Sequence, residues 1–234
     1  MNRNKNKLIE KFGEKKTEKI FQYMEGILEK NKYINLTSVN DRDEFIVKHI
    51  LDSLSVVDLD EFTKAKKIID VGTGGGFPGI PLAIAFPEKQ FVLLDSLRKR
   101  LRVIDELTEY CGICNVNTIH MRAEDAGRSD EYREKFDLCV SRAVAPLILL
   151  SEYCIPLVKK GGFFISYKGE KAEKEIEDAH KMIITLGGNI NRVEEHILDE
   201  DNASGHKLII IEKEKKTPSL YPRSAAVIKK SLRK

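Results

Sequence analysis

The sequence predicts an α/β fold in which a mostly parallel sheet carries helices on both faces. From residue 67 onwards, short apolar segments alternate with segments of helical length. This alternation is typical of a parallel sheet that is covered on both sides. A glycine-rich segment also follows the first apolar segment and opens a predicted helix. The chain has 234 residues, which is enough for roughly one or two domains.

Residues 1–64 are predicted to form an N-terminal helical extension that packs on the core. Apolar side chains recur at mostly helical spacing over residues 5–30. Either Asn40 or Asp41 can cap a second helix, because a short polar side chain accepts a hydrogen bond from the first turn. We expect this second helix to continue through Val57.

Residues 65–214 are predicted to form the sheet and the helices that cover it. Seven segments have the pattern of strands, namely 68–71, 91–94, 116–121, 136–140, 163–167, 189–198 and 206–213. Four segments between them have helical length, namely 79–86, 97–111, 146–159 and 170–186. Gly161-Gly162 and Gly187-Gly188 follow the last two helices, where glycine commonly ends a helix. No convincing helix separates the last two strands, so we expect them to be antiparallel.

The charge of the chain is unevenly distributed. The formal net charge is +3, but residues 1–32 and 213–234 together carry about +11, which leaves −8 for the residues between them. Basic ends on an acidic body favour an acidic partner, above all a nucleic acid. They are equally compatible with solvated tails that only keep the protein in solution. Residues 215–234 are therefore predicted to be a basic C-terminal tail.

Several classes of protein are excluded by composition. The longest stretch without charge, residues 71–87, contains five Gly and three Pro, so no membrane helix is expected. The N-terminus is charged rather than apolar, which argues against a secretory signal. Four scattered cysteines are expected to be reduced. Cys111 and Cys114 form one C-x-x-C, but no second Cys or His pair stands at zinc-ligand spacing. We expect a cytoplasmic protein, a monomer without bound metal.

The glycine-rich segment, Ile-Ile-Asp-Val-Gly-Thr-Gly-Gly-Gly-Phe-Pro-Gly, begins at residue 68. It lacks the Gly-Lys-Ser/Thr that a phosphate-binding P-loop requires. A dinucleotide-binding loop has its third glycine at the position of Phe77. The spacing of Gly72, Gly74 and Gly76 instead suits a small adenosyl ligand without a pyrophosphate. A tight structural turn is the alternative interpretation.

Polar residues follow the next strands at the same edge of the sheet. Asp95 ends the second strand, 23 residues after Gly72, where a carboxylate can accept both hydroxyls of a ribose. Asp95 or Ser96 can also cap the helix that follows. Ala123 and Glu124 follow the third strand, where an adenine would lie.

The fourth and fifth strands are followed by basic residues. Arg142 brings a guanidinium to the mouth of the predicted site, where it can orient a guanine or anchor a phosphate. Lys168 faces the same opening and can hold a phosphate. His49 stands beside apolar residues on a predicted helix, where a histidine is more often a packing residue than a site residue.

This order of motifs resembles the class I S-adenosylmethionine-dependent methyltransferases. More narrowly, the chain resembles the rRNA small subunit methyltransferase G family, also called the glucose-inhibited division protein B family, over roughly residues 20–223. The motifs that carry this resemblance are Asn-Leu-Thr at 35–37, His-Ile-Leu-Asp-Ser-Leu at 49–54, the glycine segment at 70–82, Ser-Arg-Ala at 141–143 and Tyr-Lys-Gly at 167–169. The resemblance implies a Rossmann-like fold, S-adenosylmethionine as cofactor, and methylation of N7 of one guanine in the decoding-region loop of 16S ribosomal RNA. Either the RNA or the small ribosomal subunit would be the partner.

The resemblance also implies roles for individual residues. Gly72 and Phe77 would lie beside the methionine, and Arg142 would close the pocket next to the transferred methyl group. Further cofactor contacts would come from Gly74, Gly76, Asp95, Ser96, Leu97, Ala123 and Glu124. RNA would be contacted by Arg142, Lys168 and Arg223. The tail after Arg223 departs from the family pattern, which leaves its RNA contact open.

The chemistry implied by the resemblance requires little from the protein beyond positioning. Guanine N7 offers a lone pair and loses no proton, so no catalytic general base is expected. The fourth strand is not followed by Asp/Asn-Pro-Pro-aromatic or by Pro-Cys, the motifs that amino-directed and C5-pyrimidine enzymes would carry. A small-molecule methyltransferase or a cofactor-binding module whose basic ends aid solubility is the alternative.

Overall fold

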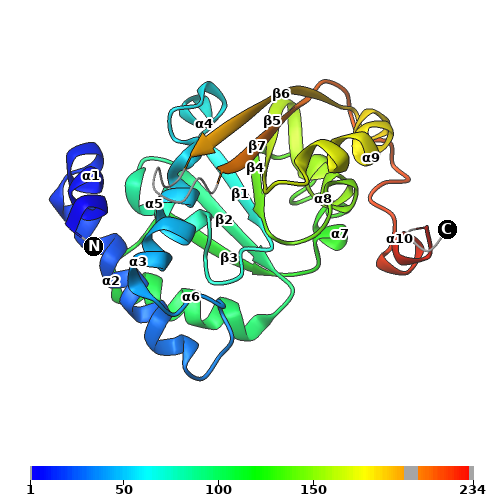
Figure 1. Cartoon of the computed structure of the whole chain (residues 1–234). Helices are drawn as coiled ribbons and strands as arrows, with labels where there is room; N and C mark the ends of the chain where they lie inside the picture. Colours follow the sequence, from blue (N-terminus) through cyan, green and yellow to red (C-terminus); the bar gives the residue numbers. More distant parts are fainter. Residues whose placement is uncertain (1, 198–204, 232–234) are drawn as a thin grey trace.

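A computed structural model describes residues 2–197 and 205–231. Seven strands form one sheet in the order β3-β2-β1-β4-β5-β7-β6 (Figure 1). The strands are β1 (Lys67–Val71), β2 (Gln90–Asp95), β3 (Val116–His120), β4 (Phe136–Arg142), β5 (Val158–Lys168), β6 (Gly188–Ile197) and β7 (Gly205–Lys213). The first five are parallel, whereas β7 runs antiparallel to both β5 and β6. The predicted α/β fold with a mostly parallel seven-stranded sheet is confirmed.

Helices cover both faces of the sheet, as the sequence predicts. They are α1 (Asn2–Phe12), α2 (Glu14–Asn31), α3 (Arg42–Phe45), α4 (Asp60–Lys64), α5 (Gly79–Ala85), α6 (Arg98–Tyr110), α7 (Ala123–Ala126), α8 (Leu147–Cys154), α9 (Ala172–Thr185) and α10 (Ala225–Ser231). Side chains of α2, α5 and α6 share one buried apolar cluster with one face of the sheet, and those of α8 and α9 share another with the opposite face. Ile68 and Ile69 enter different clusters because successive side chains of a strand point to opposite faces.

The helices of the N-terminal part are more broken than the sequence pattern indicates. Gly13, with a φ of 84°, separates α1 from α2 within the expected helix 5–30. Asp41 does cap the next helix, because its side chain accepts a hydrogen bond from Glu44 N at 2.9 Å. That helix does not continue to Val57 as one α-helix. It becomes the π-helical segment η1 (Ile46–Leu51) and then the short 3₁₀ helix η2 (Leu54–Val56).

The expected helix 146–159 is also too long. It ends at Cys154, is followed by the 3₁₀ helix η3 (Ile155–Leu157), and β5 begins at Val158. Gly161-Gly162 therefore lies inside a strand and does not end a helix. Gly187, in contrast, follows α9 with a φ of 86°, as predicted.

The N-terminal extension supports the glycine loop between β1 and α5. Tyr23 of α2 is buried, and its hydroxyl donates a hydrogen bond to the carbonyl oxygen of Gly75 at 2.9 Å. Asn31, the last residue of α2, accepts hydrogen bonds from the N–H groups of Leu36 and Thr37 at 2.8 and 3.0 Å. These contacts fix the segment after α2 beside the C-terminal edge of the sheet.

The segment after β7 is held against the body of the protein. Arg133 donates hydrogen bonds to the carbonyl oxygens of Thr217 and Tyr221, each at 2.7 Å, and Arg128 donates to Pro222 at 2.8 Å. The two ends of the chain lie at opposite ends of the molecule (Figure 1). None of the described helices combines the length and the apolar character that crossing a membrane requires.

Candidate functional site

A cavity of about 300 Å³ lies at the C-terminal ends of β1, β2 and β3. Five residues expected to bind the cofactor line it, namely Gly72, Asp95, Ser96, Ala123 and Glu124. Arg100, Met121, Val144 and Tyr153 are among the other lining residues. In an α/β sheet with parallel strands, a ligand binds at this edge, outside the carboxyl ends of the strands.

Asp95 joins this cavity to the glycine loop. Its carboxylate accepts a hydrogen bond from Gly74 N at 3.0 Å through Oδ2 and one from Leu97 N at 2.8 Å through Oδ1. The side chain is almost fully buried, and Arg100 Nη1 lies 3.7 Å from Oδ2. Asp95 therefore stabilises the turn before α6 and also presents its carboxylate to the cavity. Leu97 contributes its backbone N–H, while its side chain is exposed.

Three glycines of the loop, Gly72, Gly74 and Gly76, differ in what a side chain would meet. All have positive φ, namely 74° at Gly72, 60° at Gly74 and 93° at Gly76, a region that glycine occupies without steric cost. A Cβ on Gly74 would meet nothing closer than 4.0 Å. A Cβ on Gly76 would lie 2.5 Å from the hydroxyl of Tyr23, so this glycine is required by packing. The loop thus leaves open space at Gly74, next to the carboxylate of Asp95, and this arrangement fits an adenosyl ligand.

Phe77 lies behind the loop and does not line the cavity. Its ring is buried, stacks on the ring of His49 with centroids 4.9 Å apart, and packs edge-to-face against Phe45 and Tyr23. Phe77 therefore contributes by packing the loop against the N-terminal extension. The resemblance implies that Phe77 lies beside the methionine; its ring does not line the cavity, and a contact through its backbone stays a prediction.

A second cavity, of about 470 Å³, adjoins the first. Arg142 and Lys168 line it together with His49, Asp52, Glu175 and His206. Ala143 lines both cavities and has a φ of 56°, a backbone conformation that costs a non-glycine residue energy. Strain of this kind is concentrated at functional sites. Arg142, which the resemblance places next to the transferred methyl group, lines this second cavity directly before Ala143, and its contact with the cofactor stays a prediction.

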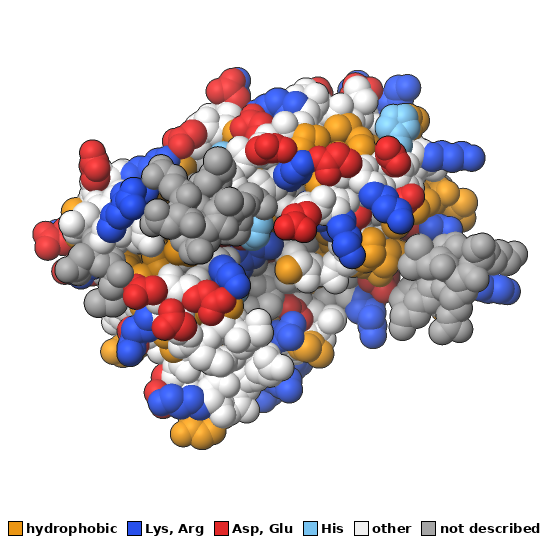
Figure 2. All heavy atoms as spheres, viewed as in Figure 1, with side chains coloured by type: hydrophobic (Ala, Val, Ile, Leu, Met, Phe, Trp, Pro, Cys, Tyr) orange, Lys and Arg blue, Asp and Glu red, His pale blue; other side chains and the backbone are white. Residues whose placement is uncertain are grey.

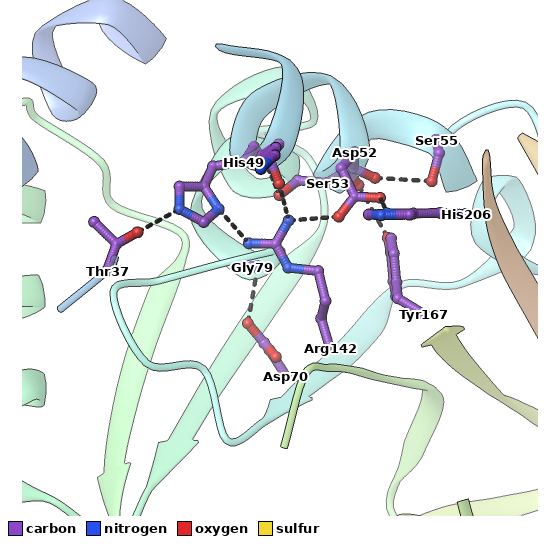
Figure 3. Close-up of polar contacts among 11 residues, drawn as sticks. Thr37, His49, Asp52, Ser53, Ser55, Asp70, Gly79, Arg142, Tyr167 and His206 are labelled. Carbon is purple, nitrogen blue, oxygen red and sulfur yellow. Dashed lines mark hydrogen bonds and ion pairs between the residues drawn. The ribbon is translucent and has the colours of Figure 1, made fainter. Parts of the chain in front are cut away.

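Figure 3 shows the guanidinium of Arg142 pointing from the end of β4 toward η1. Its Nη1 donates to Asp52 Oδ2 at 2.6 Å and to the carbonyl oxygen of Lys48 at 2.8 Å. Its Nη2 donates to His49 Nδ1 at 3.0 Å. Three of the five N–H groups of the guanidinium are thereby used, and among the described residues no hydrogen bond from the other two is found.

Asp52 is the buried carboxylate that fixes this arrangement. Its Oδ1 lies 2.8 Å from His206 Nδ1, and its side chain is 1% exposed. Burial acts to raise the pKa of Asp52, but the hydrogen bond from His206 and the charge of Arg142 outweigh burial and lower it. The hydrogen bond to Asp52 in turn raises the pKa of His206. Both carboxylate oxygens of Asp52 are therefore occupied by partners from other elements.

His49 is a neutral hydrogen-bonded residue in this structure. A guanidinium can only donate, so His49 Nδ1 is the acceptor, and Nε2 carries the proton that it donates to Thr37 Oγ1 at 2.6 Å. Burial and the charge of Arg142 lower the pKa of His49 to about 4. Both ring nitrogens are engaged, which leaves no free nitrogen to act as a general base.

The other two basic residues expected to bind RNA are paired within the protein. Lys168 Nζ lies 2.7 Å from Glu175 Oε2 and donates to the carbonyl oxygen of Ala145 at 2.7 Å. Arg223 Nη2 lies 2.7 Å from Glu152 Oε2, and Glu152 is buried. RNA contact by Lys168 and Arg223 stays a prediction, and any such contact would have to be made alongside these ion pairs.

Sequence reasoning missed Asp52, His206, Glu175 and Tyr23 as parts of the site. Asp52 belongs to a motif that carried the resemblance, so a signal for it was present. His206 and Glu175 stand in segments that showed no motif. Their roles depend on contacts between residues that are distant in the sequence, and only the folded chain reveals such contacts.

The sheet order, the glycine loop and the acidic end of β2 define a class I methyltransferase. Two solved structures are similar, the cofactor-bound Rv0187 from MTB and NSun6 from Pyrococcus horikoshii with SFG. The first has a TM-score of 0.57 and 17% identity and covers 82% of this chain and 90% of that chain. The second has a TM-score of 0.56 and 16% identity and covers 77% of this chain and 57% of that chain.

Sequence comparison shows the family to which this chain belongs. Residues 16–202 match the model for the family described as rRNA small subunit methyltransferase G. The protein of that name from Clostridium novyi is 46% identical over 91% of this chain and 87% of its own length, and the one from Clostridium tetani is 43% identical over 94% and 91%. The chain belongs to the rRNA small subunit methyltransferase G family. It is therefore an S-adenosylmethionine-dependent methyltransferase.

Proposed function

We propose that this protein transfers a methyl group from S-adenosylmethionine to N7 of a guanine in the decoding-region loop of 16S ribosomal RNA. Membership of the family supports the RNA substrate, because its curated relatives are named for the small-subunit ribosomal RNA. The observation that carries the proposal is the second cavity, which adjoins the cofactor cavity at Ala143 and contains an incompletely satisfied guanidinium. We assign the first cavity to the cofactor and the second to the guanine.

The residues of the two cavities can perform this reaction by positioning alone. S-adenosylmethionine supplies an electrophilic methyl group. Asp95 would hold the adenosyl moiety at the tips of β1 and β2, beside the open space at Gly74. Arg142 retains two N–H groups that can donate to guanine O6, since arginine recognises such acceptors through its rigid fork. Guanine N7 needs no deprotonation, which agrees with the engaged and neutral state of His49.

We propose that the protein works as a monomer in the cytoplasm, where ribosomal subunits occur. Basic and acidic side chains are interspersed over the face shown in Figure 2. We therefore assign the electrostatic attraction for RNA to the basic ends of the chain.

Replacing the reacting atom tests this function directly. We expect labelled S-adenosylmethionine to methylate 16S RNA, either free or assembled into small subunits. RNA that contains 7-deazaguanosine at the target position should not be methylated, because a C–H group replaces N7. Equal methylation of both RNAs would show that another atom is the acceptor. Failure with guanosine RNA in both the free and the assembled form would exclude this substrate.

A further inference from the structure

Glu175 of α9 brings a carboxylate with one free oxygen into the second cavity. Its Oε2 accepts a hydrogen bond from Leu147 N at 2.6 Å and lies 2.7 Å from Lys168 Nζ. Within the part of the chain that the structure describes, no hydrogen bond to its Oε1 is found. The side chain is 25% exposed. Glu175 is thus fixed through one oxygen and can accept hydrogen bonds through the other.

The strand order places Glu175 on the side of Arg142 that is remote from the cofactor cavity. Asp95 ends β2, Gly72 follows β1, Arg142 ends β4 and Lys168 ends β5, and these four strands are neighbours in that order. Arg142 pairs in register with Tyr167, directly before Lys168. Because neighbouring strands lie about 4.8 Å apart, a ligand above β4 has the cofactor on one side and Glu175 on the other.

A guanine in this position would present complementary edges to the two sides. N7 belongs to one edge of the purine, whereas the donors N1–H and N2–H₂ belong to the Watson–Crick edge, which points away from N7. When N7 is directed toward the cofactor, the Watson–Crick edge is directed toward β5 and α9. Asp52 lines the same cavity, but its two oxygens already accept from Arg142 and His206. Glu175 is the carboxylate there with an oxygen to spare.

We propose that Glu175 is a specificity-determining residue that accepts hydrogen bonds from N1–H and N2–H₂ of the target guanine. This inference rests on the function proposed above and adds the means by which guanine is chosen. Adenine has no N1–H and no 2-amino group, so it would leave the carboxylate without donors. A site built to hydrogen-bond a particular group rejects analogues that lack it, because its own polar atoms are then left unpaired.

The test compares Glu175→Gln with the wild-type protein on two RNAs that share N7. One RNA carries guanosine at the target position and the other carries inosine, which lacks the 2-amino group. We expect wild-type kcat/KM to be at least about 10-fold higher for guanosine than for inosine, because inosine loses one hydrogen bond to a charged group. In Glu175→Gln, kcat/KM for guanosine should fall about 10- to 100-fold, and the preference for guanosine over inosine should nearly disappear.

A matched control separates base recognition from loss of charge or structure. Glu177 lies on the same helix and is exposed, so Glu177→Gln makes the same change outside the cavity and should keep the wild-type preference. In Glu175→Gln the cofactor affinity, measured by calorimetry, should be unchanged, and thermal unfolding should stay cooperative although the ion pair with Lys168 is weakened. An unchanged ratio between the two RNAs in Glu175→Gln would overturn the inference, whatever the absolute rates. A wild-type protein that methylates neither RNA would instead refute the proposed function itself.

Discussion

Asp95 holds the glycine loop and the cofactor cavity together through one carboxylate. Asp95→Ala removes the acceptor that we assign to the ribose hydroxyls and also frees Gly74 N. We expect the affinity for S-adenosylmethionine to weaken by about 2–4 kcal/mol, as for two hydrogen bonds to a charged group. Calorimetry measures this change. Asp105→Ala is the control, since Asp105 is exposed and pairs with Thr118 outside the cavity; equal affinities in both variants would refute the assignment.

Arg142 is expected to act mainly after RNA has bound. Arg142→Ala removes the donors that orient the guanine, and removing such a donor typically lowers kcat about 10²-fold or more. RNA affinity should change much less, because most of it comes from phosphate contacts elsewhere. Single-turnover methyl transfer at saturating RNA and cofactor measures the effect. A wild-type rate in this variant would place Arg142 away from the reacting atoms.

His49 makes the stability of the protein depend on pH in a defined direction. Its pKa is lowered to about 4 in the folded state, from about 6.5 in an unfolded chain. The unfolded state therefore binds a proton first as the pH falls, and stability is lost between pH 6.5 and 4. Relative to His49→Gln, the wild-type protein should lose about 2 kcal/mol of unfolding free energy between pH 8 and pH 5. Urea unfolding of both proteins at the two pH values measures this difference, and a parallel response would contradict it.

Within the glycine loop, Gly74 and Gly76 should respond to substitution in different ways. A Cβ at Gly74 meets nothing closer than 4.0 Å, but its φ of 60° strains a β-branched residue, so in Gly74→Val the loop should shift and cofactor binding should be lost while the fold survives. Gly76→Ala brings its Cβ within 2.5 Å of the Tyr23 hydroxyl and 2.7 Å of Ile80, so the melting temperature should fall. Thermal unfolding and calorimetry on both variants distinguish the two effects. Loss of cooperative unfolding in Gly74→Val would favour a purely structural turn.

Most elements could be predicted because their cause is local. The apolar runs of β1, β2 and β4 and the glycine after α9 each follow from a few adjacent residues. The break of the expected helix 40–57 into α3, η1 and η2 could not, because its apolar pattern suits a regular helix equally well. The geometry of η1 coincides with contacts that its residues make to Arg142 and Thr37, which are distant in the sequence or outside the helix. The pattern alone carries no information about such contacts.

At the scale of the whole molecule, the basic ends should determine how strongly RNA binding depends on salt. Removing residues 224–234 deletes Lys229, Lys230, Arg233 and Lys234. The slope of log affinity against log salt should become shallower by about 0.7 for each lost contact to a single-stranded phosphate. Cofactor affinity should stay the same, because we assign the cofactor to the cavity at the ends of β1, β2 and β3. Filter binding of 16S RNA across a salt series measures the slope. An identical slope for the truncated and the full-length protein would show that other residues contact the RNA phosphates.

Only part of the candidate site could be predicted, because the rest depends on contacts between residues that are distant in the sequence. The cofactor half is built from strand tips and the turns after them, so Gly72, Asp95 and Glu124 were visible as a series of motifs. The second half is built from pairs such as Asp52 with His206 and Asp52 with Arg142. The members of these pairs are 154 and 90 residues apart. A single sequence does not reveal which distant polar residues will meet.

Ala143 can couple ligand binding in the two cavities. It lines both of them in a conformation with positive φ, so a ligand that shifts this residue in one cavity alters the wall of the other. Thermodynamic linkage requires the effect to be mutual. If the cofactor raises the affinity for RNA by some factor, RNA must raise the affinity for the cofactor by the same factor.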